Sequence, residues 1–193
     1  MKAGTALAPI GLEPSQTSGG VIAVPTVNKS IEVDVPVRVA YDQWTQFEEF
    51  PRFMEGVEAV QQLDDKRLHW RARVAGKVEE WDAEIAEQVP DKVIVWRSTS
   101  AARNEGIVHF VPLGENKTKI ELELHWAPTD VAERIGDVLG ADDVRVQGDL
   151  NGFKKFIEER RTPTGAWRGE IHGSRVEGDR AEEDQEAGTG SRG

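Results

Sequence analysis

One long amphipathic segment, residues 129–161, constrains the fold of this chain more than any other stretch. Its apolar residues recur at three- and four-residue steps, so on a helix of 3.6 residues per turn they form one stripe. The stripe consists of Val131, Ile135, Val138, Leu139, Val146, Leu150, Phe153 and Ile157. Pro128 and Asp130 are typical of a helix start, and Arg161 followed by Pro163 is typical of a helix end. An unbroken helix of this length spans about 45–50 Å and needs a large apolar partner surface.

Asp142 interrupts the stripe, and two interpretations stay open. In the first, the helix breaks at residues 140–143 and Asp142 caps its second half. In the second, the helix continues and Asp142 points toward a ligand. The helical glycines, including Gly148 and Gly152, fall on the side away from the stripe at 100° per residue. We therefore expect them to face solvent or to weaken the helix.

Alternating apolar and polar residues predict seven β-strands before this helix. These strands lie at residues 31–35, 57–63, 68–74, 80–85, 93–96, 106–111 and 118–126. Between the first two strands, helical spacing from Val37 to Trp44 predicts one short helix, and the apolar group around Phe50 and Phe53 predicts a second. Short turns between successive strands indicate an antiparallel sheet with one apolar face. The long helix is the natural cover for that face.

The clearest local prediction is a hairpin that turns at Ala75 and Gly76. Pairing Val74 with Lys77 places Trp70 opposite Trp81 on one face. On the other face, the same register places Arg71 opposite Glu80 and His69 opposite Asp82. Cross-strand pairs of these kinds stabilise a register, so the agreement between the two faces supports the hairpin.

Both ends of the chain differ in composition from the middle. Residues 1–26 are rich in small residues and proline, and residues 163–193 are rich in glycine and charge. Segments of this kind bury too little apolar area to offset their chain entropy. We expect a disordered N-terminal segment (1–26), a single folded domain (27–162) and a disordered acidic tail (163–193).

Charge and residue content exclude several classes of function. The net charge of −11 argues against binding to nucleic acids or to anionic membranes. The absence of cysteine excludes disulfides, thiolate zinc sites and a cysteine nucleophile. No apolar run is long enough for a membrane span, and the N-terminus is a poor signal peptide. A cytoplasmic protein without a metal or cofactor is the expectation, and its protein partners stay undetermined.

Several short motifs together resemble the START superfamily, also called helix-grip or SRPBCC. Within it, residues 27–162 are similar to the polyketide cyclase/dehydrase and coenzyme Q-binding START group. The resemblance is carried by Phe47-Glu48-Glu49-Phe50-Pro51-Arg52-Phe53-Met54, by Trp81, Ala83 and Ile85, by Trp96, by Gly106-x-Val108-x-Phe110, by Trp126-x-Pro128 and by Asp149-Leu150-x-x-Phe153-Lys154-x-x-Ile157-Glu158. It implies an α+β helix-grip fold, in which a curved antiparallel sheet of about seven strands wraps around the long C-terminal helix. It also implies an apolar cavity between sheet and helix, which holds lipids, quinones or polyketides in members of the superfamily.

The predicted cavity wall is a set of twelve apolar side chains from the sheet, the short helices and the helix stripe. The set is Trp44, Phe53, Met54, Trp70, Trp81, Trp96, Phe110, Leu122, Leu124, Val146, Leu150 and Phe153. Six tryptophans are many for a domain of this size, and sites for apolar ligands are lined by aromatic residues. Plain core packing is the alternative for each residue taken singly.

No convincing catalytic group emerges, and Glu79, His109 and Asp142 are the only weak candidates. Glu79 shares a face with Trp81 near the hairpin end, where an exposed position is the alternative. His109 lies on the polar side of its strand unless a bulge reverses it. Three hypotheses follow, in order: binding of a hydrophobic small molecule, a polyketide cyclase or dehydratase using the same cavity, and a non-catalytic module for protein interactions.

Overall fold

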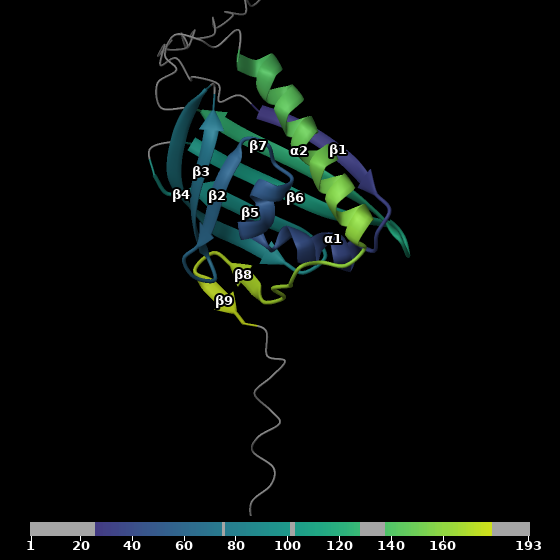
Figure 1. Cartoon of the computed structure of the whole chain (residues 1–193). Helices are drawn as coiled ribbons and strands as arrows, with labels where there is room; N and C mark the ends of the chain where they lie inside the picture. Colours follow the sequence, from purple (N-terminus) through teal and green to yellow (C-terminus); the bar gives the residue numbers. More distant parts are fainter. Residues whose placement is uncertain (1–25, 75, 101–102, 128–137, 179–193) are drawn as a thin grey trace, which may run out of the picture.

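The computed structural model describes residues 26–74, 76–100, 103–127 and 138–178 of the 193-residue chain. Its elements, in chain order, are β1 (Thr26–Val33), α1 (Val37–Trp44), the 3-10 helix η1 (Phe47–Arg52), β2 (Val57–Gln62), β3 (Arg67–Val74), β4 (Lys77–Val89), β5 (Val93–Ser98), β6 (Arg103–Gly114), β7 (Lys117–Ala127), α2 (Val138–Arg160), β8 (Glu170–His172) and β9 (Arg175–Glu177). Figure 1 shows α2 crossing one face of the sheet, with α1 near its C-terminal end. This arrangement confirms the predicted helix-grip fold.

The sheet has the strand order β1-β7-β6-β5-β4-β3-β2, with antiparallel pairing throughout. The predicted count of about seven strands is low, because β8 and β9 extend the sheet from β4 to a total of nine. The seven strands of the main path correspond to the seven predicted from alternation. The two extra strands are three residues each, too short for an alternating pattern to reveal.

The β3–β4 hairpin has the predicted register. Trp70 pairs with Trp81, Arg71 with Glu80 and His69 with Asp82. The two indole rings are stacked, with centroids 5.9 Å apart and planes 5° apart. Gly76 lies in the turn and has a φ of 83°, a left-handed conformation that glycine adopts without steric cost.

Helix α2 is continuous through residues 140–143, so the interpretation of a helix break is wrong. Residues 128–137 of the predicted helix lie outside the described residues. The stripe residues Val146, Leu150, Phe153 and Ile157 are buried as predicted. Lys154 Nζ donates to the Glu32 carbonyl at 2.6 Å, which ties the helix to β1.

One predicted feature of α2 differs from the structure. Gly148 has open space where a Cβ would lie, in agreement with the expected solvent-facing side. Gly152, by contrast, lies against the backbone carbonyl of Phe53 at the end of η1, where a Cβ would collide. The helical wheel placed Gly152 away from the stripe but carried no information about η1, which packs beside the stripe.

Residues 163–178 also differ from expectation, because they pack on the domain rather than forming part of a disordered tail. We call residues 162–178 the C-terminal clasp. Strand β8 pairs with β4, with Ile171 opposite Gln88, and the Ile171 side chain is fully buried. Backbone pairing and one well-placed apolar side chain therefore order a segment whose average composition indicates disorder. Residues 1–25 and 179–193 lie outside the described part of the chain.

Candidate ligand cavity

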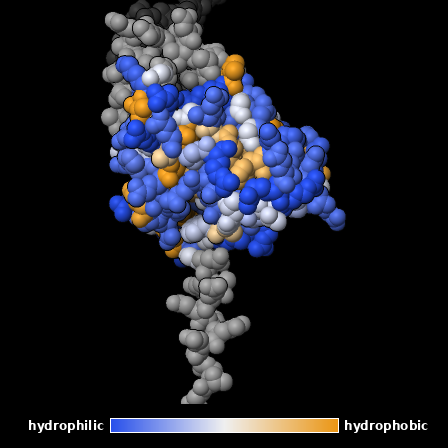
Figure 2. Space-filling model, in the orientation of Figure 1, coloured by the Kyte–Doolittle hydropathy of each residue, from blue (hydrophilic) through white to orange (hydrophobic). Residues whose placement is uncertain are grey.

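A cavity of about 130 Å³ lies between α2, the short helices and the apolar face of the sheet. Its lining residues are Trp44, Phe47, Phe50, Met54, Val57, Leu68, Trp70, Ala72, Trp81, Trp96, Asn104, Leu122, Leu124, Arg145, Val146, Asp149 and Leu150. The outer surface on the face of Figure 1 is mainly hydrophilic, with smaller groups of apolar residues (Figure 2). The twelve apolar side chains predicted for the wall are buried or partly buried.

Nine of the twelve predicted wall residues line this cavity, and Phe53, Phe110 and Phe153 do not. These three rings pack in the core behind the wall. Phe153 contacts the ring of Trp44 with centroids 4.8 Å apart, and Phe110 contacts Trp44 at 6.0 Å. Phe153 and Phe110 thus support the indole of Trp44, and this indole lines the cavity. Alternation in strands and periodicity in helices identify buried residues. They do not show which of these residues line the cavity and which lie behind its wall.

Trp96 on β5 is held in place by two residues of the adjacent strand β6, Asn104 and Gly106. Its indole Nε1 donates a hydrogen bond to Asn104 Oδ1 at 3.2 Å, and its ring covers Gly106, where any side chain would collide with it. Gly106 is the register partner of Trp96 between β5 and β6. The missing side chain therefore makes room for the tryptophan that forms this part of the wall.

Trp70 places an unusual polar atom at the cavity wall. Its indole Nε1 is buried and has no hydrogen-bond partner among the residues that the structure describes. A buried donor without a partner costs roughly 1–3 kcal/mol. Because Trp70 also lines the cavity, this N–H is a candidate donor for an oxygen of a bound molecule.

Asp149 is the acidic side chain of the cavity wall, and sequence reasoning did not single it out. Its Oδ1 accepts a hydrogen bond from the backbone N–H of Glu55 at 3.2 Å. Burial raises the pKa of Asp149 to about 6, although the Arg145 guanidinium one turn earlier in α2 opposes the shift. A signal was available: Asp149 lies three residues after Val146 and four before Phe153, at the edge of the apolar stripe.

Arg145 contributes a cationic side chain to the same wall. Its guanidinium lies against Gly56, where a Cβ would meet it. Arg145 and Asp149 are four residues apart in α2, so they project from the same side of the helix. The cavity thus combines an apolar interior with a carboxyl, a guanidinium and the Asn104 amide.

The three weak catalytic candidates do not join this group. Glu79 is half-buried opposite Ala72 but is not part of the cavity lining. His109 is exposed and borders a shallow polar depression on the outer side of β1, β6 and β7 with Lys29 and Glu121. Asp142 belongs to α2, but its side chain lies outside the described residues. The side chain of His109 lies on the polar side of β6, as expected for a strand without a bulge at this position.

The described part of the chain contains neither a cluster of metal ligands nor a membrane-spanning helix. No group of three or more histidine, aspartate or glutamate side chains is arranged to hold a metal ion there. None of the helices in the same residue ranges is both long enough and apolar enough to cross a membrane.

The fold and the cavity define a helix-grip protein, and comparison with known proteins gives its family. The model of the family described as "polyketide cyclase / dehydrase and lipid transport" matches residues 33–143. An uncharacterized 17.2 kDa protein encoded in the melC2-rnhH intergenic region of Streptomyces lincolnensis is 48% identical over 146 residues, covering 75% of this chain and 97% of the relative. The chain therefore belongs to the polyketide cyclase/dehydrase and lipid transport family of the SRPBCC superfamily.

Solved structures share the fold at lower identity. DR_A0006 from Deinococcus radiodurans is 25% identical with a TM-score of 0.57, covering 70% of this chain and 98% of its own. A START superfamily protein from Mycobacterium smegmatis is 16% identical with a TM-score of 0.58, covering 70% and 96%. The Zhui aromatase/cyclase from Streptomyces sp. R1128 is 16% identical with a TM-score of 0.57, covering 73% and 98%.

Proposed function

We propose that this protein binds a hydrophobic small molecule in the cavity between α2 and the sheet. The observation that carries the proposal is the cavity wall, in which apolar side chains and four tryptophans surround a small number of polar groups. Ligand sites in proteins have this composition, because apolar area supplies affinity and a few polar atoms fix orientation. A lipid, an isoprenoid quinone and a polyketide are the candidate classes.

The volume of the cavity limits the size of the ligand group that it can hold. Ligand pockets usually measure about 300–1,000 Å³, whereas an engineered cavity of about 150 Å³ accommodates benzene. The cavity of about 130 Å³ therefore matches one ring or a short chain end. A larger ligand would place one ring or chain end inside, or would require the wall to move.

The polar groups favour a ligand that carries oxygen. A ligand hydroxyl can donate to Asp149, and a ligand hydroxyl or carbonyl oxygen can accept from Arg145 or from the Trp70 N–H. A pure hydrocarbon would leave the Trp70 N–H without a partner. Quinones and polyketides fit this pattern better than the alkyl chain of a lipid.

Asp149 supports a second candidate function, a polyketide cyclase or dehydratase. Elimination of water needs a group that exchanges protons near neutral pH in a dry pocket. A carboxyl with a pKa of about 6 in the cavity wall meets that requirement. The third hypothesis, a protein-interaction module that uses the acidic tail, gains no support, since residues 179–193 lie outside the described part of the chain.

Native mass spectrometry of the gently extracted protein tests the binding function. We expect a co-purified apolar molecule on the wild type and its loss from Ala72→Leu, because Ala72 is fully buried and lines the cavity. Ala59→Leu is the matched control, since Ala59 is exposed on the neighbouring strand β2. Wild-type protein that carries no ligand and binds no ring-sized aromatic probe would contradict the proposal.

A further inference from the structure

The C-terminal clasp binds the last turn of α1, and it does so from outside the residues matched by the family model. The Thr164 N–H donates to Gln43 Oε1 at 2.9 Å, and Gln43 Nε2 donates to Thr164 Oγ1 at 3.2 Å. The Trp167 N–H donates to Thr45 Oγ1 at 3.1 Å. The clasp thus forms hydrogen bonds on both sides of Trp44, the α1 residue that reaches the cavity.

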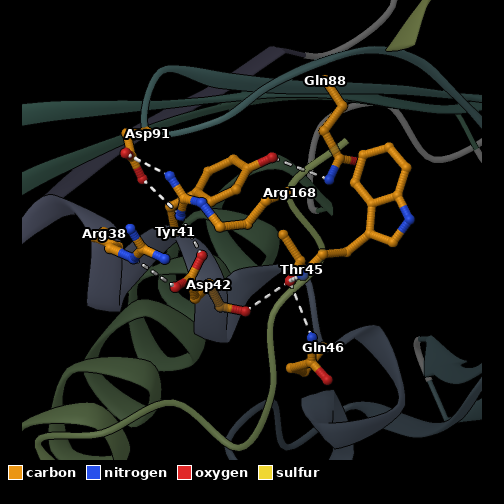
Figure 3. A network of polar contacts seen from close by, with 9 residues as sticks. Arg38, Tyr41, Asp42, Thr45, Gln46, Gln88, Asp91 and Arg168 are labelled. Carbon is orange, nitrogen blue, oxygen red and sulfur yellow. Dashed lines mark hydrogen bonds and ion pairs between the residues drawn. The ribbon is translucent and has the colours of Figure 1, made fainter. Parts of the chain in front are cut away.

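Arg168 adds a charged anchor beside these bonds, as Figure 3 shows. Its Nη1 lies 2.5 Å from Asp42 Oδ1, and its Nη2 lies 2.7 Å from Asp91 Oδ2. The guanidinium also covers the ring of Tyr41, 5.7 Å from its centroid. Tyr41 in turn accepts a hydrogen bond from Gln88 on β4. Arg168 therefore joins α1 to the turn after β4 and to the body of the sheet.

The Asp42 carboxylate depends on this partner. Its side chain is only 7% exposed, and its second neighbour, Arg38, is 3.6 Å away with 68% of its side chain exposed. Burial raises the pKa of Asp42, and hydrogen bonding to Arg168 opposes that shift. A buried carboxylate that loses its closest cation is strongly disfavoured. Without Arg168, Asp42 would move toward water, and the last turn of α1 would move with it.

Helix α1 has little stability of its own. It has eight residues, and its N-cap residue, Pro36, makes no side-chain capping bond. Helices this short are marginal in water without tertiary contacts. The clasp contacts three of the four positions from Asp42 to Thr45, and the fourth is Trp44. The position of the Trp44 wall is therefore coupled to the clasp.

We propose that Arg168 is a positioning residue for the cavity: by holding Asp42, it sets the last turn of α1 and the Trp44 wall, so that ligand affinity depends on a contact outside the cavity. The effect on affinity rests on the proposed binding function. The effect on α1 does not, and it can be measured without any ligand.

The test uses full-length Arg168→Met and Arg168→Lys, with Arg175→Met as the matched control. Arg175 lies in β9 of the same clasp, its side chain is 76% exposed, and its ion pair is with Glu177. Titration calorimetry with 2-naphthol, an aromatic of two fused rings with one hydroxyl, measures affinity; one of its rings matches the volume of the cavity. Amide hydrogen exchange at residues 41–45 measures the order of the last turn of α1. Both are recorded under conditions where circular dichroism shows every variant folded.

We expect Arg168→Met to weaken 2-naphthol binding about tenfold, which corresponds to about 1.4 kcal/mol, and to speed exchange at residues 41–45. Arg168→Lys should recover part of both effects, and Arg175→Met should leave both unchanged. The proposal would be overturned if Arg168→Met kept the affinity and the hydrogen exchange of the wild type. It would also be overturned if Arg175→Met changed both readouts as much as Arg168→Met does. Should Arg168→Met not fold, Arg168→Lys decides: it keeps the positive charge but lacks the planar guanidinium that bonds Asp42 and Asp91 together. It should change both readouts in the same direction, and wild-type values for Arg168→Lys would overturn the proposal. If wild-type protein does not bind 2-naphthol, the binding proposal fails for this probe, while hydrogen exchange still decides the role of Arg168.

Discussion

The indole of Trp96 covers Gly106 on the neighbouring strand, and its N–H donates to Asn104 at 3.2 Å. This relationship builds one wall of the cavity from three residues on β5 and β6. It depends on the missing side chain of Gly106 as much as on the indole itself.

Gly106→Ala should disturb this wall. A Cβ at residue 106 would collide with the Trp96 ring and lie 2.8 Å from a Leu124 methyl group. Overpacking of a core typically costs about 1–3 kcal/mol, so we expect a loss of that size in the free energy of unfolding, together with weaker binding of ring-sized aromatics. Urea unfolding measures the first effect. Unchanged stability would show that Trp96 has room to move aside.

Two glycines of α2 provide a matched pair. Gly152→Ala would press a methyl group against the Phe53 carbonyl, whereas Gly148→Ala would place one in open space. Alanine is favoured over glycine in helices by about 1 kcal/mol, so Gly148→Ala should stabilise the protein by up to about that amount. Gly152→Ala should destabilise the protein, although it brings the same gain in helix propensity. Thermal unfolding of both variants checks the opposite signs, and equal shifts would contradict the close approach of α2 to η1.

Asp149 should make stability depend on pH. Because its pKa is raised from 3.8 to about 6 in the folded state, its stabilising contribution is complete below pH 4 and is lost as the pH rises through about 6. Asp149→Asn keeps an acceptor for the Glu55 N–H but cannot ionise. Relative to the wild type, this variant should therefore gain stability between pH 4 and pH 7 by about 1–2 kcal/mol, allowing for partial exposure of the side chain.

Urea unfolding of the wild type and Asp149→Asn across this pH range provides the measurement. Asp64→Asn is a useful control, because hydrogen bonds from Arg67 and Lys66 lower the pKa of Asp64 below its usual 3.8. Asp64 is then ionised in both the folded and the unfolded state above pH 4, so the stability difference between wild type and Asp64→Asn should stay constant across this range. A difference between wild type and Asp149→Asn that is independent of pH would mean that Asp149 titrates like an ordinary exposed carboxyl.

Ile171 tests whether the clasp contributes to the core. Its side chain is fully buried beneath the β4–β8 pair, and truncation of a buried isoleucine to alanine typically costs 2–5 kcal/mol, so we expect about 2 kcal/mol or more. Val176→Ala in the paired strand β9 should cost less, since Val176 is only partly buried. Guanidinium unfolding compares the two variants. A negligible effect of Ile171→Ala would place the clasp outside the cooperative unit.

Much of the fold follows from local pattern. The alternation in the main strands, the register of the β3–β4 hairpin and the stripe from Val146 to Ile157 all rest on two periods, 2.0 and 3.6, that the backbone imposes. These periods say which side of an element is apolar. The family resemblance then supplied the arrangement of sheet and helix, which periodicity alone leaves open.

The site was predicted only in part, for a related reason. Trp44 and Trp70 line the cavity as expected, whereas Phe153 and Phe110 support it from behind, and the distinction depends on distances between elements far apart in the chain. Asp149 belongs to one of the motifs of the family resemblance, but the sequence does not mark it as a polar wall residue, because its raised pKa comes from burial by packing.

By itself, the sequence determined the apolar face of each element and the pairing of neighbouring strands, since both depend on residues close together in the chain. Only the tertiary structure decided that α2 continues through residues 140–143, that Gly152 contacts Phe53, and that Arg168 joins Asp42 to Asp91. These contacts link residues up to 126 positions apart. Their energies depend on burial and on the distance between partners, and neither quantity is present in a local pattern.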